Sequence, residues 1–178
     1  MKIGTLNFTP AINSPELLAV NVSRAIESGK LEDALAARID PTLADTAAFC
    51  EHYNIGPEIS ANCVIVEAKR GERTWYAACM ILATQKADIN GVIRHHLDAR
   101  KVSFAPMDIA TSLTGMEYGG ITPIGLPSDW PVLVDKTIGS TSYVVIGSGL
   151  RGSKIVIPGS SLALLPGAEV IGLAKAAI

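Results

Sequence analysis

Aromatic residues are scarce in this sequence, and so is any excess of one charge. Phe, Trp and Tyr make up 5% of the 178 residues, and 15 Lys and Arg oppose 17 Asp and Glu, for a net charge of −2. This balance excludes the broad basic face of proteins that hold long nucleic acids by their phosphates, but not a local contact with one nucleotide terminus. The hydrophobic fraction of 48% excludes a disordered chain. The length fits a single domain, residues 1–178.

The sequence also has few cysteines and no long apolar run. Cys50, Cys63 and Cys79 are widely spaced and odd in number, which argues against a disulfide framework or a zinc site and favours free thiols in a reducing compartment. Residues 1–10 contain no apolar signal region, and the longest apolar run, residues 76–83, is too short to span a bilayer. We therefore predict a cytoplasmic protein with no metal and no membrane partner.

Hydrophobic periodicity and turn residues predict interleaved helices and strands. Residues 1–10 are predicted to form an extended arm. Helices are predicted at residues 15–28, 44–53, 89–97, 106–114 and 161–165, and strands at 63–68, 74–84, 101–104, 131–135, 142–146 and 154–157. Most of the strands are joined by short turns, which favour antiparallel pairing, so the predicted fold class is α+β with a mixed, largely antiparallel sheet.

Gly147–Gly152 matches the dinucleotide-binding pattern G-x-G-x-x-G after a predicted strand. That site also needs a helix next, because the N-terminal amides of the helix bind the pyrophosphate. Here the β-branched segment 153–158 follows and ends at a proline. We therefore predict a glycine-rich hairpin turn and no nucleotide cofactor.

His95 and His96 adjoin on a predicted helix, between Arg94 and Arg100. Adjacent helical residues point in different directions and cannot chelate one metal well, so the pair is interpreted as a solvated helix face or a weak phosphate-contacting patch. The sequence contains neither a G-x-S-x-G elbow nor a P-loop lysine, which disfavours a covalent hydrolase.

The stretch Thr114–Pro127 holds four glycines and two prolines in fourteen residues. Glycine lets a ligand approach the backbone and proline stiffens the path, so N–H groups in such a loop can be preorganised donors for a developing oxyanion. An ordinary crossover loop with strict turn geometry would have the same composition. Both interpretations stay open on the residues alone.

This stretch resembles the signature of the YbaK/ProRS-editing family of aminoacyl-tRNA deacylases. In that family a helix ends in Thr-Gly, and a loop Gly-Gly-x-Ser/Thr-Pro-x-Gly forms the floor of the editing pocket. Thr114-Gly115 and Gly119–Gly125 match both parts in order and spacing. Residues 131–135 are similar to the family's strand ending in aspartate, and residues 146–152 to its glycine-rich turn. The similarity starts near residue 40, and residues 1–39 lie outside it.

The resemblance implies a mixed β-barrel packed by helices, and trans-editing hydrolysis of the ester in a mischarged aminoacyl-tRNA, whose 3′ end is the expected partner. A water attacks the ester, the free ribose hydroxyl of the substrate helps to activate it, and the protein orients the ester and stabilises the oxyanion. On this resemblance, catalytic roles fall to Asn62, Gly120 and Thr122, substrate contacts to Gly115, Tyr118, Gly119, Ile121, Pro123, Asp135, Gly147 and Gly149, and nucleic-acid contacts to Lys136, Arg151 and Lys154.

The chain departs from the family at the start of the first core strand. Family members commonly carry a lysine there, where this sequence has Ala61. Asn62 beside it is able to donate a hydrogen bond, and Lys86, Lys136 or Arg151 are candidates to supply a cation from elsewhere. Two functions therefore stay open: an active deacylase, and a catalytically inactive module that binds aminoacyl-adenosine or another small ligand.

Overall fold

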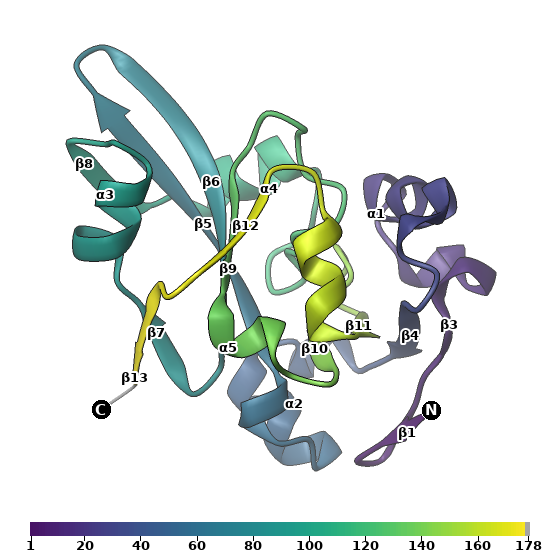
Figure 1. The fold of residues 1–178 in the computed structure, drawn as a ribbon. Coiled ribbons are helices and arrows are strands. Elements are labelled where there is room, and N and C mark those ends of the chain that lie inside the picture. The colour runs from purple at the N-terminus through teal and green to yellow at the C-terminus, as the bar shows by residue number, and fades with distance from the viewer. Residues whose placement is uncertain (177–178) are drawn as a thin grey trace.

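The computed structural model describes residues 1–176, which are organised by two larger β-sheets (Figure 1). The five-stranded sheet has the order β12 (Ala168–Ile171), β9 (Val132–Asp135), β6 (Arg73–Leu82), β5 (Ala61–Arg70) and β8 (Lys101–Phe104). The four-stranded sheet has the order β10 (Val144–Gly147), β11 (Ser153–Ile157), β4 (Leu35–Arg38) and β3 (Thr9–Pro10). Two short pairs complete the strands: β1 (Lys2–Ile3) with β2 (Leu6–Asn7), and β7 (Gln85–Ala87) with β13 (Ala174–Ala176).

The helices are short and lie around these sheets. The α-helices are α1 (Val20–Ala25), α2 (Thr46–Tyr53), α3 (Arg94–His96), α4 (Met107–Thr114) and α5 (Lys136–Gly139). Single 3₁₀ turns cover Ala11–Asn13, Pro15–Leu17, Pro41–Leu43 and Pro57–Ile59, a longer one covers Gly159–Leu164, and π-helical turns cover Ile26–Lys30 and Ile89–Ile93. Asp45 caps α2 by accepting hydrogen bonds from two backbone N–H groups of its first turn. Gly115 ends α4 in the left-handed conformation, with φ at 65°.

The hairpin of β5 and β6 is the longest feature of the larger sheet and extends to the upper left in Figure 1. Its register runs from Ala61 opposite Leu82 to Arg70 opposite Arg73, with Gly71 in the turn at φ 60°. The sequence predicts these paired strands, and the structure confirms them. The predicted turn of residues 147–152 is likewise confirmed: β10 ends at Gly147, and β11 begins at Ser153, where a dinucleotide site would need a helix.

The α+β class and the mainly antiparallel pairing are confirmed, but the structure corrects the predicted barrel. Within residues 1–176 the two larger sheets do not close: their only hydrogen-bonded link is a single bridge between Ser60 and Val145. Closure stops there because β5 continues away from β10 and pairs with β6 and β8 instead. Among the strand pairs of residues 1–176, only those of β9 with β6 and β12 are parallel, and the isolated bridge between Ser60 and Val145 is parallel as well.

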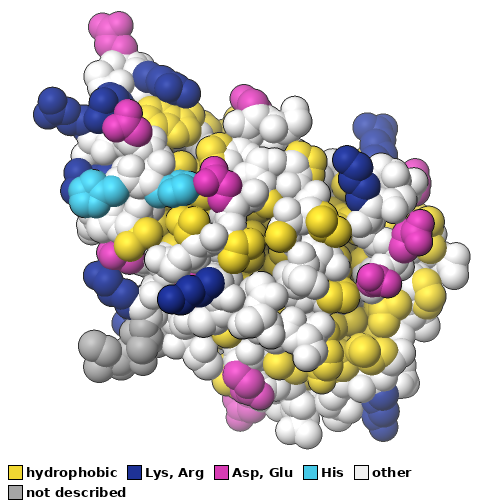
Figure 2. All heavy atoms as spheres, viewed as in Figure 1, with side chains coloured by type: hydrophobic (Ala, Val, Ile, Leu, Met, Phe, Trp, Pro, Cys, Tyr) yellow, Lys and Arg dark blue, Asp and Glu magenta, His cyan; other side chains and the backbone are white. Residues whose placement is uncertain are grey.

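The main hydrophobic core lies between the two larger sheets and rests on aliphatic side chains, as the composition predicts. Met80 and Val134 contribute from one sheet, Ile146 and Ile155 from the other, and Val22 from α1. On the face shown in Figure 2, positive and negative side chains are interspersed, and a group of positive ones lies around the β5–β6 hairpin and α3. None of the helices in residues 1–176 has the length and apolarity needed to cross a membrane.

Candidate functional site

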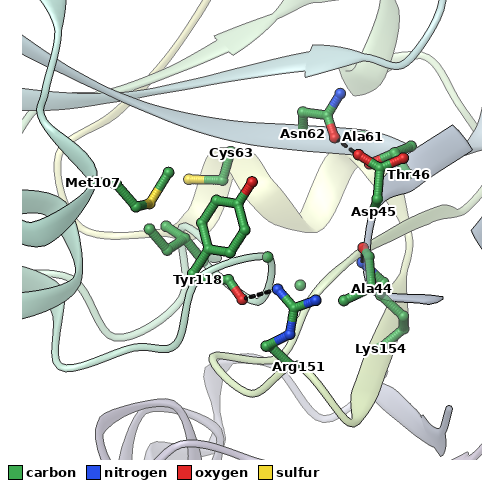
Figure 3. Close-up of a pocket in the computed structure, with 13 residues that line it drawn as sticks. Ala44, Asp45, Thr46, Ala61, Asn62, Cys63, Met107, Tyr118, Arg151 and Lys154 are labelled. Atoms are coloured by element: carbon green, nitrogen blue, oxygen red, sulfur yellow. Dashed lines mark hydrogen bonds between the residues drawn. The ribbon is translucent and has the colours of Figure 1, made fainter. Parts of the chain in front are cut away.

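A cavity of about 230 Å³ opens where four segments meet: the N-terminal end of α2, the first residues of β5, the glycine-rich loop of residues 115–125, and the turn of residues 147–152 (Figure 3). Its wall is completed by the first residue of α4. The lining residues are Ala44, Asp45, Thr46, Ala61, Asn62, Cys63, Met107, Tyr118, Gly119, Ile121, Gly147, Arg151 and Lys154.

The glycine-rich loop is braced by the turn of residues 147–152. The N–H of Glu117 donates to the carbonyl of Gly149 at 2.9 Å, and the N–H of Gly149 donates to the carbonyl of Gly120 at 2.7 Å. From the same turn, the backbone N–H of Arg151 donates to the Glu117 carboxylate at 2.7 Å, and its guanidinium donates to the Tyr118 carbonyl at 2.9 Å. The segment that resembles a dinucleotide motif therefore holds the cavity floor in place.

Close backbone packing explains two of the glycines. A β-carbon on Gly120 would lie 2.5 Å from the carbonyl oxygen of Leu150, and one on Gly147 would lie 2.4 Å from the carbonyl oxygen of Gly120. Neither neighbour is a flexible side chain, so neither position tolerates alanine without a backbone shift. These glycines are required by the brace itself.

The floor leaves two backbone donors unused. Within residues 1–176 the structure gives no hydrogen-bond acceptor to the N–H of Gly119 or of Ile121, and both residues line the cavity. The N–H of Gly120 donates to the Glu117 carbonyl at 3.0 Å. Gly120, for which the family resemblance implies a catalytic role, therefore has its N–H occupied, and its two neighbours carry the available donors.

Strand β5 supplies one wall. The side-chain oxygen of Asn62 accepts a hydrogen bond of 2.6 Å from the hydroxyl of Thr46, which fixes the amide in place (Figure 3). Ala61 beside it brings no polar group. Burial, reinforced by the neighbouring Cys79, raises the pKa of Cys63 well above its ordinary value, so its thiol is protonated at neutral pH and is a poor nucleophile.

Two cations and one carboxylate give the cavity a net positive charge. Arg151 lines the cavity, and its guanidinium lies 5.3 Å from the centre of the Tyr118 ring. Lys154, from β11, is only 7% exposed, and its Nζ donates to the carbonyl of Ala44 at 3.2 Å. The pKa of Lys154 is lowered to about 8: burial is the main cause and Arg151 contributes, while Cys50 and Asp45 act in the opposite direction.

The structure therefore brings together seven of the sequence-predicted residues and Ala61 around the cavity, and leaves the other seven outside its lining. Asn62, Tyr118, Gly119, Ile121, Gly147, Arg151 and Lys154 line the cavity, whereas Gly115, Gly120, Thr122, Pro123, Asp135, Gly149 and Lys136 do not. Of the latter, Gly120 and Gly149 form the brace directly beneath the floor. Thr122 is fully buried and its hydroxyl has no partner within residues 1–176. Lys136 is exposed at the start of α5.

Asp135 has a structural position instead. One carboxylate oxygen accepts hydrogen bonds from the N–H and hydroxyl of Thr137 at the start of α5, and the other accepts from the N–H groups of Leu173 and Ala174. Burial alone would raise the pKa of Asp135, but these hydrogen bonds lower it below its ordinary value of 3.8. With both oxygens occupied, the carboxylate ties the C-terminal segment to β9.

Sequence reasoning missed Ala44, Asp45, Thr46, Cys63 and Met107 as lining residues. The predicted helix of residues 44–53 places the start of α2 approximately, but not its position against β5. No metal cluster accompanies these residues: within residues 1–176 no three His, Cys, Asp or Glu side chains are grouped to hold an ion. His96 instead contacts the Glu169 carboxylate at 3.0 Å, and His95 lies beside the Arg94 guanidinium.

Solved structures with this fold include three that match nearly their whole length. A putative trans-editing enzyme for prolyl tRNA synthetase has a TM-score of 0.73 at 17% identity, over 88% of this chain and 96% of its own. A hypothetical protein has a TM-score of 0.76 at 20% identity, over 87% and 99% of the two chains. A scaffold for computational epitope backbone grafting has a TM-score of 0.75 at 16% identity, over 88% and 97%.

These likenesses are all below 25% identity and establish the fold. The family follows from the sequence, because residues 40–164 match the model of the aminoacyl-tRNA editing domain. That segment contains every residue that lines the cavity. The chain belongs to the aminoacyl-tRNA editing domain family, and specifically to the YbaK/ProRS-editing group that its glycine-rich loop resembles.

Proposed function

We propose that this protein hydrolyses the ester that joins a wrongly attached amino acid to the 3′ end of a tRNA. Membership of the editing family gives the reaction class. The observation that carries the proposal is the pair of free N–H groups, on Gly119 and Ile121, at the floor of an open cavity. Preorganised backbone donors of this kind stabilise the oxyanion of acyl transfer.

In the proposed reaction, water adds to the ester carbonyl carbon, and the carbonyl electron pair moves onto oxygen. The tetrahedral intermediate collapses by breaking the bond to the ribose oxygen, which takes up the proton that the water has lost. The products are the free amino acid and a tRNA that ends in a hydroxyl. Asn62, fixed by Thr46, is placed to orient the ester or the water.

The size of the cavity suits an aminoacyl group. At about 230 Å³ it is smaller than the roughly 300–1,000 Å³ of pockets that enclose a whole drug-sized ligand. The terminal nucleotide would then lie outside, next to Tyr118, which is 58% exposed and lies against the Arg151 guanidinium. An exposed aromatic ring beside a cation is a common contact for a nucleotide end.

The second candidate function is a binding module that retains the cavity without turnover. Ala61 favours it, because strand β5 brings no cation to the cavity. Such a module would bind aminoacyl-adenosine through the same loop and release it unchanged.

Incubation with a panel of mischarged tRNAs separates the two functions. Deacylation of at least one member above the spontaneous rate is expected, and Asn62→Ala should lower that rate about tenfold or more through loss of orientation. Asn13→Ala, on an exposed 3₁₀ turn away from the cavity, is the matched control and should have no effect. Tight binding of a non-hydrolysable aminoacyl-adenosine with no turnover of any tRNA would establish the binding module instead.

A further inference from the structure

Lys154 is a buried lysine without a carboxylate partner. Its side chain extends from β11 between α2 and the cavity, and is 7% exposed. Within residues 1–176 no carboxylate oxygen lies within 4.0 Å of its Nζ, whereas Lys69 and Lys175 each form an ion pair. An uncompensated buried charge destabilises a fold, so its presence in a cavity wall calls for a functional reason.

The ammonium group also has spare hydrogen-bonding capacity. Lys154 has three N–H donors and makes one hydrogen bond, to the carbonyl of Ala44, with the Phe49 ring centre 5.1 Å away. Arg151, the other cation of the cavity, is already engaged, because its guanidinium donates to the Tyr118 carbonyl and lies against the Tyr118 ring. Lys154 therefore has the free donors that a negative oxygen would need.

We propose that Lys154 is a catalytic residue of the deacylation, whose ammonium group neutralises the negative charge that develops on the ester carbonyl oxygen. This inference rests on the proposed function and adds a charged partner to the Gly119 and Ile121 amides. It also accounts for Ala61: the cation that β5 does not provide comes from β11, across the same cavity. The other candidates, Lys86 and Lys136, do not line the cavity.

The role has a defined pH dependence. Four features face the lysine: Asp45 and Cys50 favour its charged form, while burial and Arg151 disfavour it, and together they lower its pKa to about 8. Lys154 is therefore mostly charged at pH 7 and becomes neutral as the pH rises through about 8. A cation that stabilises an oxyanion must then lose its effect above that pH.

The test compares Lys154→Met, Lys154→Arg and the control Lys86→Met, an exposed lysine on β7. On the best substrate of the mischarged panel, Lys154→Met should lower kcat/KM at pH 7 about a hundredfold, the usual effect of removing one oxyanion donor. Lys86→Met should match the unchanged protein. With spontaneous hydrolysis subtracted, kcat/KM of the unchanged protein should fall above pH 8, whereas that of Lys154→Arg should stay level to pH 9.5. An NMR titration of the lysine side chains supplies a readout without substrate, and one signal with a midpoint near 8 should vanish in Lys154→Met.

Each result decides the question. If the unchanged protein deacylates and Lys154→Met is equally active, Lys154 is not catalytic and the proposed function stands without it. If the rate rises through pH 8 and Lys154→Arg is inactive, the neutral amine acts as a base and the cationic role is wrong. If Lys154→Met does not fold, the pH profile of Lys154→Arg decides. If the unchanged protein deacylates nothing, both proposals fail together.

Discussion

The two ends of strand β5 differ in how the charged groups near them are paired and in how much space surrounds the glycines near them. At the hairpin tip, Arg70 pairs with Asp98 at 2.8 Å, both side chains are exposed, and a β-carbon on Gly71 would meet nothing within 4 Å. At the cavity end, Lys154 is buried with no carboxylate of residues 1–176 within 4.0 Å, and a β-carbon on Gly120 would collide with backbone. At the tip, the charged side chains pair with each other. At the cavity end, hydrogen-bond donors remain without an acceptor among residues 1–176, in a loop that is held by close backbone packing. Unsatisfied polar groups held rigidly mark a functional site better than charge alone does.

The largest expected effect comes from alanine at Gly120, for which alanine at Gly71 is the comparison. Gly120→Ala forces a β-carbon to 2.5 Å from the Leu150 carbonyl oxygen, and should destabilise the protein by on the order of 3 kcal/mol, a fall in Tm of roughly 6–12 °C. Gly71→Ala has open space and suffers only from its positive φ, at about 1 kcal/mol. Thermal unfolding measures both. Equal stability losses would remove the contrast between the two ends.

A second buried charge sharpens the comparison, because Asp135 has all the partners that Lys154 lacks. Asp135→Asn places an amide against the N–H groups of Leu173 and Ala174 and should destabilise the protein by about 2 kcal/mol. Deacylation per folded molecule should not change, since Asp135 lies outside the cavity. Loss of activity without loss of stability would show instead that Asp135 contacts the substrate.

The pKa of Asp135 adds a pH signature. It is lower in the folded protein than the ordinary 3.8, so its contribution to stability is present above about pH 3.8 and is lost as the pH falls through the folded value. Between pH 6 and pH 3, the unchanged protein should therefore lose more Tm than Asp135→Asn does. Parallel curves for the two proteins would contradict this assignment.

Lys154→Met should change the stability of the protein in the opposite direction to Asp135→Asn. A methionine of similar length removes the uncompensated charge and should stabilise the fold by about 1 kcal/mol at pH 7. The pKa of Lys154 is lowered from 10.5 to about 8, so the unfolded chain binds more protons between these values and stability should rise with pH across that range. In Lys154→Met this rise should be absent from the thermal unfolding curves. A destabilised Lys154→Met would mean that the contact with Ala44 outweighs the charge.

The smallest effect is expected at the tip. Arg70→Met removes an exposed ion pair, and such pairs contribute little to stability because solvent screens them. No measurable change in Tm or in deacylation is expected. A clear loss of stability would show that the ion pair at the tip also contributes to the stability of the fold.

Local signals in the sequence predict much of this fold. The β-branched run of β5, the charged turn at Gly71 and the partner strand β6 form one hairpin without distant information. Strand β4 was missed, because Leu35–Arg38 holds no β-branched residue and forms a strand only by pairing with β11 and β3. The open arrangement of the two sheets was also missed, because closure depends on the long-range contact between β10 and the start of β5.

The residues of the candidate site also divide into those with a local signal in the sequence and those whose position depends on distant partners. The family resemblance of the loop pointed to Gly119 and Ile121, and it could be recognised because glycine and proline act through local backbone geometry. The position of Asp135 depends on partners 38 and 39 residues away, and that of Lys154 depends on a carbonyl 110 residues away. Such contacts leave no periodic trace in the sequence, so a buried lysine on β11 reads like any other strand lysine.

The brace between the loop and the 147–152 turn has a consequence for how the preferred amino acid changes during evolution or engineering. The floor is backbone held by backbone, so reshaping it needs compensating changes in segments about thirty residues apart, as with Gly120 and Leu150. The wall is made of side chains on separate elements, such as Cys63 on β5 and Met107 on α4. Under the proposed function, a single substitution there would alter the volume and polarity offered to the side chain of the substrate, while the free N–H groups of Gly119 and Ile121 would stay in place. The proposed chemistry and the choice of amino acid would then change independently of each other.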